Sequence, residues 1–287
     1  MRAKRSLGQN FLVDPNIQRK IVAALEAGPA DEVLEIGPGT GALTRHLAAQ
    51  AGRVVAIEKD DDLAAALRDE FAGMPHVEVV HGDVLEVDLG ALVREPDRVK
   101  VVGNIPYNIT SPLLFRLLES ELNPERIVVM VQREVADRLL AEPGEKNYGA
   151  LSVGMRAVAR VRRLFHVGRA AFRPVPDVDS TVVLIVPYRP ARLAPEERVD
   201  LRTLTRAAFG WRRKQLQKIL RTADGYRLDA QELEAVARES GIEPERRPET
   251  LSPEEFVSLM RVLRKRGYPR GGSSPGAPGE APGMEGA

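Results

Sequence analysis

Short apolar runs alternate with amphipathic segments over the first two thirds of the chain. Residues 41–50, 60–71 and 131–141 have the apolar spacing of helices. Runs rich in valine and isoleucine predict buried parallel strands, at residues 32–36, 53–57, 77–80, 99–103 and 126–131. This alternation predicts a doubly wound, Rossmann-like α/β sheet. Residues 159–167 and 180–188 predict two more strands, added as an antiparallel pair at one edge.

The pattern changes after Pro187, where only helical spacing remains. Helices are predicted at residues 195–209, 213–220, 229–240 and 252–266. The last residues are mainly Gly, Pro and Ser with little apolar bulk, a composition typical of disorder. The sequence therefore predicts an α/β domain with an N-terminal arm at 1–188, a small helical domain at 189–267 and a disordered tail at 268–287.

Composition removes several kinds of chemistry. The 287 residues include no cysteine, which excludes disulfides, thiolate metal sites and cysteine nucleophiles. The four histidines have no metal-ligand spacing, so we expect no metal site. No apolar window reaches the length of a membrane span, and the N-terminus lacks the apolar core of a signal peptide. We expect a soluble, cytoplasmic and monomeric protein.

Positive charge is concentrated in two blocks, although the net charge is only +1. Residues 155–173 contain six arginines and no acid, and residues 201–221 contain seven lysines and arginines and no acid. Charge runs often belong to solvated faces. Two long blocks of one sign, together with a basic N-terminus, favour a polyanion as partner.

A glycine-rich turn follows the first predicted strand, in the sequence EIGPGTG at 35–41. Such turns let the backbone approach a ligand closely. Ala42 stands where a dinucleotide motif has its third glycine, and S-adenosylmethionine sites use the same turn without a phosphate. Glu58 ends the second strand, where a carboxylate accepts bonds from ribose hydroxyls of either cofactor. Asp83 follows the third strand and is placed to accept from an adenine amine, or simply to cap a turn.

The sequence NIPY at 104–107 ends the fourth strand. The N6 amine of adenine is a poor nucleophile because its lone pair is delocalised into the ring. Two acceptors for its N–H groups would favour a pyramidal nitrogen, and the Asn104 side chain with the Ile105 carbonyl supplies them. Pro106 stiffens the turn, and Tyr107 offers a face on which an extruded base stacks. An ordinary strand-ending turn is the alternative, and the position of NIPY downstream of the glycine turn argues against it.

The ordered set of these motifs resembles the ribosomal RNA adenine N6-dimethyltransferases, with the small-subunit type as the nearest likeness. It includes SLGQNFLVD, EIGPGTG, GNIPYNITSPLL, KNYGALSV, FRPVPDVDS and WRRKQLQKIL, and spans nearly all of residues 6 to 221. The resemblance implies that Asn10 and Leu12 close over S-adenosylmethionine from the arm. It places Gly37 beside the methionine part, Glu58 at the ribose and Asp83 at the adenine amine.

The resemblance also implies that Asn104 touches both cofactor and target base, and that Phe172 forms an aromatic wall opposite Tyr107. The family often has a proline and a lysine where this chain has Val175 and Asp177, so an RNA contact made by that lysine is not carried over.

The implied reaction is dimethylation of N6 on two adjacent adenosines near the 3′ end of 16S rRNA, within the small ribosomal subunit or its precursor. Three alternatives remain at this point. They are a large-subunit enzyme of the macrolide-resistance type, a mainly non-catalytic ribosome assembly factor, and a nicotinamide-dependent dehydrogenase. The last is disfavoured because no hydride-site constellation is present.

Overall fold

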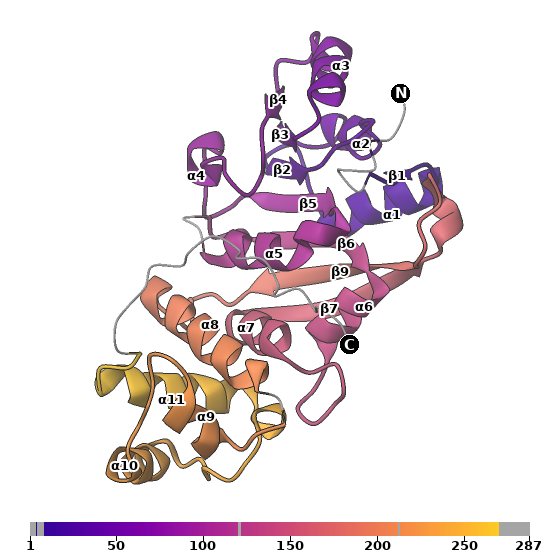
Figure 1. Cartoon of the computed structure of the whole chain (residues 1–287). Helices are drawn as coiled ribbons and strands as arrows, with labels where there is room; N and C mark the ends of the chain where they lie inside the picture. The colour runs from indigo at the N-terminus through magenta and orange to yellow at the C-terminus, as the bar shows by residue number, and fades with distance from the viewer. Residues whose placement is uncertain (1–3, 5–8, 120–121, 212, 270–287) are drawn as a thin grey trace.

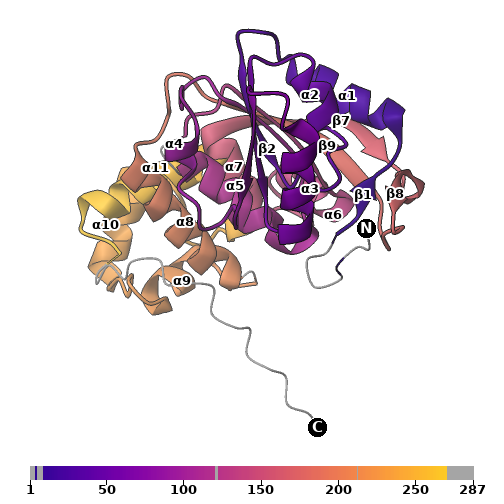
Figure 2. The same cartoon turned by 90° about the horizontal axis from the view of Figure 1, so that it is seen from above.

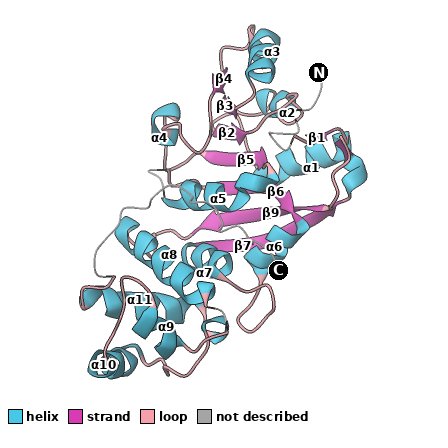
Figure 3. Cartoon of the chain, viewed as in Figure 1, coloured by secondary structure: helices cyan, strands magenta, loops and turns pink. Residues whose placement is uncertain are grey.

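A computed structural model describes residues 4, 9–119, 122–211 and 213–269, and its centre is a seven-stranded sheet with the order β4-β3-β2-β5-β6-β9-β7 (Figures 1 and 3). The strands are β2 (Glu32–Ile36), β3 (Arg53–Glu58), β4 (Val77–His81), β5 (Lys100–Asn104), β6 (Arg126–Gln132), β7 (Ala159–Val167) and β9 (Ser180–Pro187). The first five in sheet order are parallel, and β9 runs antiparallel to both β6 and β7. The predicted sheet and its antiparallel edge pair are confirmed.

Helices cover both faces of the sheet. The helices α1 (Pro15–Leu25) and α2 (Thr44–Ala48) pack on one face, where their apolar side chains meet Val33, Val54 and Val128. The opposite face is covered by α4 (Leu89–Leu92), α5 (Thr110–Glu119), α6 (Arg133–Leu140) and α7 (Ala150–Val158). The helix α3 (Asp61–Phe71) packs beside β4. Burial on both faces explains why the strands read as continuous apolar runs.

A separate core lies beyond the β7 edge, in the helices α8 (Pro195–Gly210), α9 (Leu216–Thr222), α10 (Ala230–Ser240) and α11 (Pro253–Lys265) (Figure 1). The α/β part contributes Tyr148 and Val153 to this core, and the Tyr148 hydroxyl donates to the Leu251 carbonyl at 2.7 Å. The helices therefore rest on α7 rather than on the sheet, and Figure 2 shows them grouped on the side away from α1 and α2. None of the helices in the described ranges combines the length and apolarity that a membrane crossing requires.

Some boundaries differ from the sequence prediction. The helix predicted at 41–50 is α2, which starts only at Thr44 because Gly41 has a φ of +78°. The helix predicted from residue 213 starts at Leu216. Tyr268, assigned to the tail, is buried and stacks with Tyr226. Residues 270–287 of the predicted tail lie outside the described residues.

Several elements were not predicted at all. A short strand, β1 (Phe11–Leu12), pairs antiparallel with β8 (Phe172–Arg173), and this joins the N-terminal arm to the segment before β9. The helix α1 was missed although its sequence carries a start signal. Asp14 caps the helix by accepting from the Asn16 and Ile17 N–H groups, and Pro15 occupies its first turn.

Candidate active site

A cavity of ≈ 160 Å³ opens at the carboxyl ends of β2, β3, β4 and β5. The strand order reverses between β2 and β5, which is the point where doubly wound sheets bind ligands. The described residues that line the cavity include Asn10, Leu12, Gly37, Glu58, Asp83, Asn104 and Tyr107. Seven of the eight predicted site residues therefore come together, from four strand ends and the N-terminal arm.

The glycine turn forms the floor of this cavity. Gly37 has a φ of +63°, a conformation that side chains other than glycine rarely adopt. Gly39 also has a positive φ, and a Cβ there would lie 3.0 Å from a ring carbon of Phe11. The turn is thus shaped both for close backbone approach to a ligand and for direct contact with the arm.

Glu58 ends β3 and is buried beside the turn. Its Oε2 accepts from the Gly39 N–H and its Oε1 from the Asp60 N–H, each at 2.9 Å. Burial raises the pKa of Glu58, and these two hydrogen bonds only partly oppose the shift. Each carboxylate oxygen has a second lone pair, so the side chain is fixed in position and still able to accept from a diol.

Asp83 lies at the cavity wall, but it is already paired. The Lys59 ammonium lies 2.6 Å from its Oδ2, and the Leu85 N–H donates to its Oδ1 at 2.9 Å. Burial alone would raise the pKa of Asp83, yet Lys59 and the Leu85 N–H hold it below its usual range. Asp83 therefore stays ionised and keeps spare acceptor capacity toward the cavity. Both readings of this residue, turn cap and cavity acceptor, fit the geometry.

Asn104 stands at the end of β5 with its amide held by the arm. Its Nδ2 donates to the Asn10 carbonyl at 2.9 Å. A carbonyl only accepts, so the amide nitrogen must face Asn10 and the amide oxygen must point the other way. Tyr107 follows in a short 3-10 turn, and its hydroxyl lies 3.1 Å from the Ser180 hydroxyl.

Phe172 does not reach the cavity. Its side chain is fully buried in the core with Leu12 and Ile21, and its backbone pairs with Leu12 in the two-stranded ladder. The expectation of an aromatic wall opposite Tyr107 is therefore not met in this structure. The residue anchors the arm instead, because β1 and β8 bring the two segments together.

Glu35 is a cavity residue that the sequence reasoning passed over. It lines the cavity at 1% exposure, and its Oε2 has no hydrogen-bond partner within the described part of the chain. Burial raises the pKa of Glu35 to about 7, and the neighbouring Glu58 carboxylate adds to the shift. The signal was available: a glutamate inside an otherwise apolar strand, directly before the glycine turn.

The charges around the cavity discriminate between the two cofactor classes. Its charged lining in the described residues consists of Glu35, Glu58 and Asp83, with Lys59 committed to Asp83. A dinucleotide pyrophosphate would meet net negative charge here. S-adenosylmethionine carries a sulfonium and an ammonium, and the buried Glu35 carboxylate, whose Oε2 has no hydrogen-bond partner among the described residues, fits such a cation.

Each basic block contains cations that pair with an acid and cations that do not. Arg156, Arg163 and Arg202 form ion pairs with Glu142, Asp137 and Glu119 at 2.7, 2.7 and 2.8 Å. Other exposed cations have side chains that form no ion pair in the described ranges: Arg160, Arg162, Arg169, Arg206, Arg213, Lys214, Lys218 and Arg221. Arg169 contacts an acid only through its backbone N–H, which donates to Asp179. Arg160 and Arg162 border a groove of ≈ 470 Å³ between β7 and the start of α11.

Comparison with known proteins agrees with this geometry. The family model described as ribosomal RNA adenine dimethylase matches residues 1–265. The ribosomal RNA small subunit methyltransferase A of Geobacter metallireducens is 44% identical over 93% of this chain and 98% of its own. That of Moorella thermoacetica is 46% identical, covering 91% of this chain and 92% of the relative.

Solved structures give the same result. A dimethyladenosine transferase from Plasmodium falciparum has a TM-score of 0.76 at 28% identity, covering 90% of this chain and 98% of its own. The 23S rRNA methyltransferase ErmE has a TM-score of 0.65 at 27% identity, covering 89% of this chain and 100% of its own. The predicted enzyme class and S-adenosylmethionine as cofactor are confirmed, and the dehydrogenase alternative falls away. The chain belongs to the ribosomal RNA adenine dimethylase family.

Proposed function

We propose that this chain transfers methyl groups from S-adenosylmethionine to N6 of two adjacent adenosines near the 3′ end of 16S rRNA, in the small subunit or its precursor. The similarity to small-subunit methyltransferases is 44% over nearly the whole chain, against 27% to the large-subunit enzyme ErmE. This contrast favours the small-subunit target over the macrolide-resistance type. The intact cavity argues against a purely non-catalytic assembly factor.

The cofactor would be held by residues of the four strand ends and the arm. Bound there, S-adenosylmethionine supplies an electrophilic methyl group. We assign the ribose hydroxyls to Glu58 and the adenine amine to Asp83. Glu35 faces the cationic methionine end beside Gly37, and the arm residues Asn10 and Leu12 cover the cavity. The observation that carries this assignment is the set of carboxylates without a cationic partner other than Lys59.

Asn104 would act directly on the target base. Its amide oxygen accepts one N6–H, because its nitrogen is held by Asn10 at 2.9 Å, and the Ile105 carbonyl accepts the other. This pair directs the nitrogen lone pair toward the methyl group. With S-adenosylmethionine bound there, N6 would take the methyl group from the cofactor sulfur, and the N6 proton would leave to solvent. Fixed acceptors and positioning supply the catalysis, with no general base.

Tyr107 would stack on the extruded adenine. Its ring lines the cavity, and the contact between its hydroxyl and Ser180 holds the ring in place. A role for Phe172 in the same stack would require the β8 segment to leave the core. We therefore assign base stacking to Tyr107 alone and give Phe172 the anchoring of the arm.

RNA binding would fall to the exposed cations that have no internal acid. The groove beside Arg160 and Arg162 and the exposed cations of α8, α9 and their connection would contact phosphates, with binding that weakens steeply as salt rises. In this scheme the helical domain at 189–267 is an RNA-binding domain. We further propose that the protein acts as a monomer in the cytoplasm, where ribosomal subunits are assembled.

The experiment is methyl transfer from labelled S-adenosylmethionine to unmethylated small and large subunits, followed by primer extension to locate dimethyladenosine. Label confined to two adjacent adenosines near the small-subunit 3′ end is the expected result. Label in the large subunit would assign the chain to the resistance type. Binding to a subunit without label on either one would overturn the catalytic proposal.

A further inference from the structure

The N-terminal arm forms one wall of the cofactor cavity, and its contacts lie on both sides of that cavity. Asn10 accepts from Asn104, and the Phe11 ring packs on Gly39. Leu12 pairs with Phe172. On the other side, the Gln9 amide donates to Asp60 Oδ2 at 2.9 Å. The position of the arm therefore sets the shape of the cavity.

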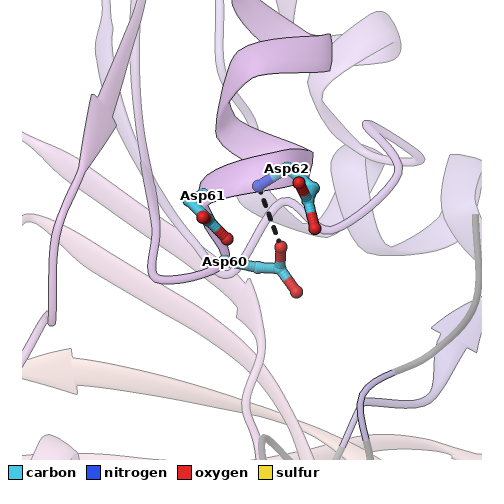
Figure 4. Close-up of side chains that lie close together, drawn as sticks. All are labelled: Asp60, Asp61 and Asp62. Carbon is cyan, nitrogen blue, oxygen red and sulfur yellow. Dashed lines mark hydrogen bonds between the residues drawn. The ribbon is translucent and has the colours of Figure 1, made fainter.

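Asp60 belongs to three consecutive aspartates at the start of α3, with Asp61 and Asp62 (Figure 4). One carboxylate oxygen from each lies within 4.8 Å of the others. Asp60 is the N-cap of α3, with a side chain only 2% exposed, whereas the other two are solvated. Three carboxylates this close repel one another, and the helix N-terminus offsets only part of that repulsion.

The compensating cation comes from the arm itself. The Lys4 ammonium lies 2.9 Å from Asp60, 3.1 Å from Asp61 and 2.9 Å from Asp62. Its hydrogen bonds to the three aspartates raise the pKa of Lys4, so it stays charged. Burial alone would raise the pKa of Asp60, but the bonds from Lys4 and Gln9 lower it. The group that satisfies this acidic cluster is thus a residue of the same chain, 56 positions away.

The cluster is also connected to the ribose acceptor. The backbone N–H of Asp60 donates to Glu58 Oε1 at 2.9 Å, so the residue that receives Lys4 also orients Glu58. Lys4 is therefore linked to the cavity in two ways. Gln9 connects it to the arm wall, and Asp60 connects it to Glu58.

We propose that Lys4 is a positioning residue that holds the arm closed over the cofactor by its ion pairs with Asp60, Asp61 and Asp62. This inference rests on the proposed cofactor site and adds the element that controls retention of the cofactor. Lys4 makes no contact with the reacting atoms. Its loss should affect how long the cofactor stays bound and leave the methyl transfer step itself unchanged.

The test uses the full-length protein and the variants Lys4→Met and Lys4→Arg, with Lys265→Met as a control of equal charge change on α11. The dissociation rate of S-adenosylmethionine is measured by rapid dilution, and KM and kcat are measured with small subunits. Lys4→Met should dissociate about threefold faster and raise KM for the cofactor with kcat unchanged. Lys4→Arg should match the wild type in every measurement, and Lys265→Met should match it in the dissociation rate of S-adenosylmethionine.

A charge exchange separates the ion pairs from any other role of the side chain. Lys4→Asp should dissociate faster still, and adding Asp61→Lys should restore part of the retention. Equal dissociation rates for the wild type and Lys4→Met would overturn the proposal, as would a fall in kcat without a change in KM. Failure of the wild type to bind S-adenosylmethionine would instead count against the proposed function.

Discussion

The cofactor cavity and the β7 edge carry unpaired charge of opposite sign. In the cavity, the Glu35 carboxylate is buried with one oxygen unsatisfied among the described atoms. At the edge, Arg160 and Arg162 are exposed and form no ion pair within the described ranges, although Glu254 lines the same groove. The first fits a cationic cofactor and the second a polyanion. Unpaired charge, more than total charge, therefore indicates what each surface binds.

The largest effect on activity should come from Asn104, a neutral residue that belongs neither to the cavity carboxylates nor to the cations of the β7 edge. Asn104→Ala removes one fixed acceptor for the N6 amine and should lower kcat by about 100- to 1,000-fold. Affinity for S-adenosylmethionine and for RNA should change by no more than about threefold, because both charge sets remain. Single-turnover methyl transfer and equilibrium binding measure the two quantities. Asn16→Ala, an exposed asparagine on α1, is the control; equal losses in rate and cofactor binding would contradict the assigned role.

Glu35→Gln removes the buried negative charge of the cavity and should weaken cofactor binding. The pKa of Glu35 is about 7, so cofactor binding by the wild type should strengthen as the pH rises from 6 to 8 and the carboxylate ionises. The variant should bind about tenfold more weakly at pH 8 and lose this pH dependence. Calorimetry at several pH values measures it. Parallel pH profiles for the two proteins would remove Glu35 from the cofactor site.

The same substitution should weaken cofactor binding at pH 8 but raise the stability of the cofactor-free chain at that pH. The folded-state pKa of Glu35 lies above its unfolded value, so the folded chain binds the proton more tightly. The stability that the folded chain gains from this proton is complete below the pKa of Glu35 in the unfolded chain. It is lost as the pH rises through about 7. Without cofactor, Glu35→Gln should therefore be more stable than the wild type at pH 8. Thermal unfolding with Glu196→Gln as the exposed control measures the difference.

The double substitution Arg160→Ala with Arg162→Ala removes the unpaired positive charge at the β7 edge and should weaken RNA binding. Removing two phosphate contacts should weaken binding to small-subunit RNA by about tenfold near 0.1 M salt and reduce the salt slope by about 2. Cofactor affinity should not change. Filter binding over a salt series measures the slope. Arg163→Ala removes a neighbouring arginine that already pairs with Asp137, so it is the matched control and should keep the slope.

The strands and the site turns could be predicted because each depends on local pattern. Apolar runs bounded by Gly37, Glu58 and Asn104 located both the sheet and its functional edge. The arm strand could not be found this way, since Phe11 pairs with Arg173 and Leu12 with Phe172, far along the chain. The burial of the Phe172 ring outside the cavity depends on that same long-range pairing, which the sequence motif does not reveal.

The basic blocks also show that sequence alone does not reveal contacts between residues far apart in the chain. Sequence located all of the cations but could not separate those with a distant acid from those without one. Arg202 and Glu119 are far apart in the chain and meet at 2.8 Å, whereas Arg206, one turn later on α8, has no acid in the described structure. Only the fold distinguishes these two neighbours, and a pair of substitutions tests whether the distinction matters.

The smallest effect, and the sharpest test of the comparison, should come from that pair. Arg202→Ala should leave RNA affinity within about twofold but lower the free energy of unfolding by about 1 kcal/mol. Burial already raises the pKa of Glu119, and Arg202 is one of two arginines that oppose the shift, so its loss leaves the carboxylate poorly compensated. Arg206→Ala should do the reverse, with about threefold weaker RNA binding and unchanged stability. Denaturant unfolding and filter binding on both variants measure the two effects, and equal losses of RNA affinity would mean that paired and unpaired cations contribute alike, which would remove the basis for assigning the RNA surface from unpaired charge.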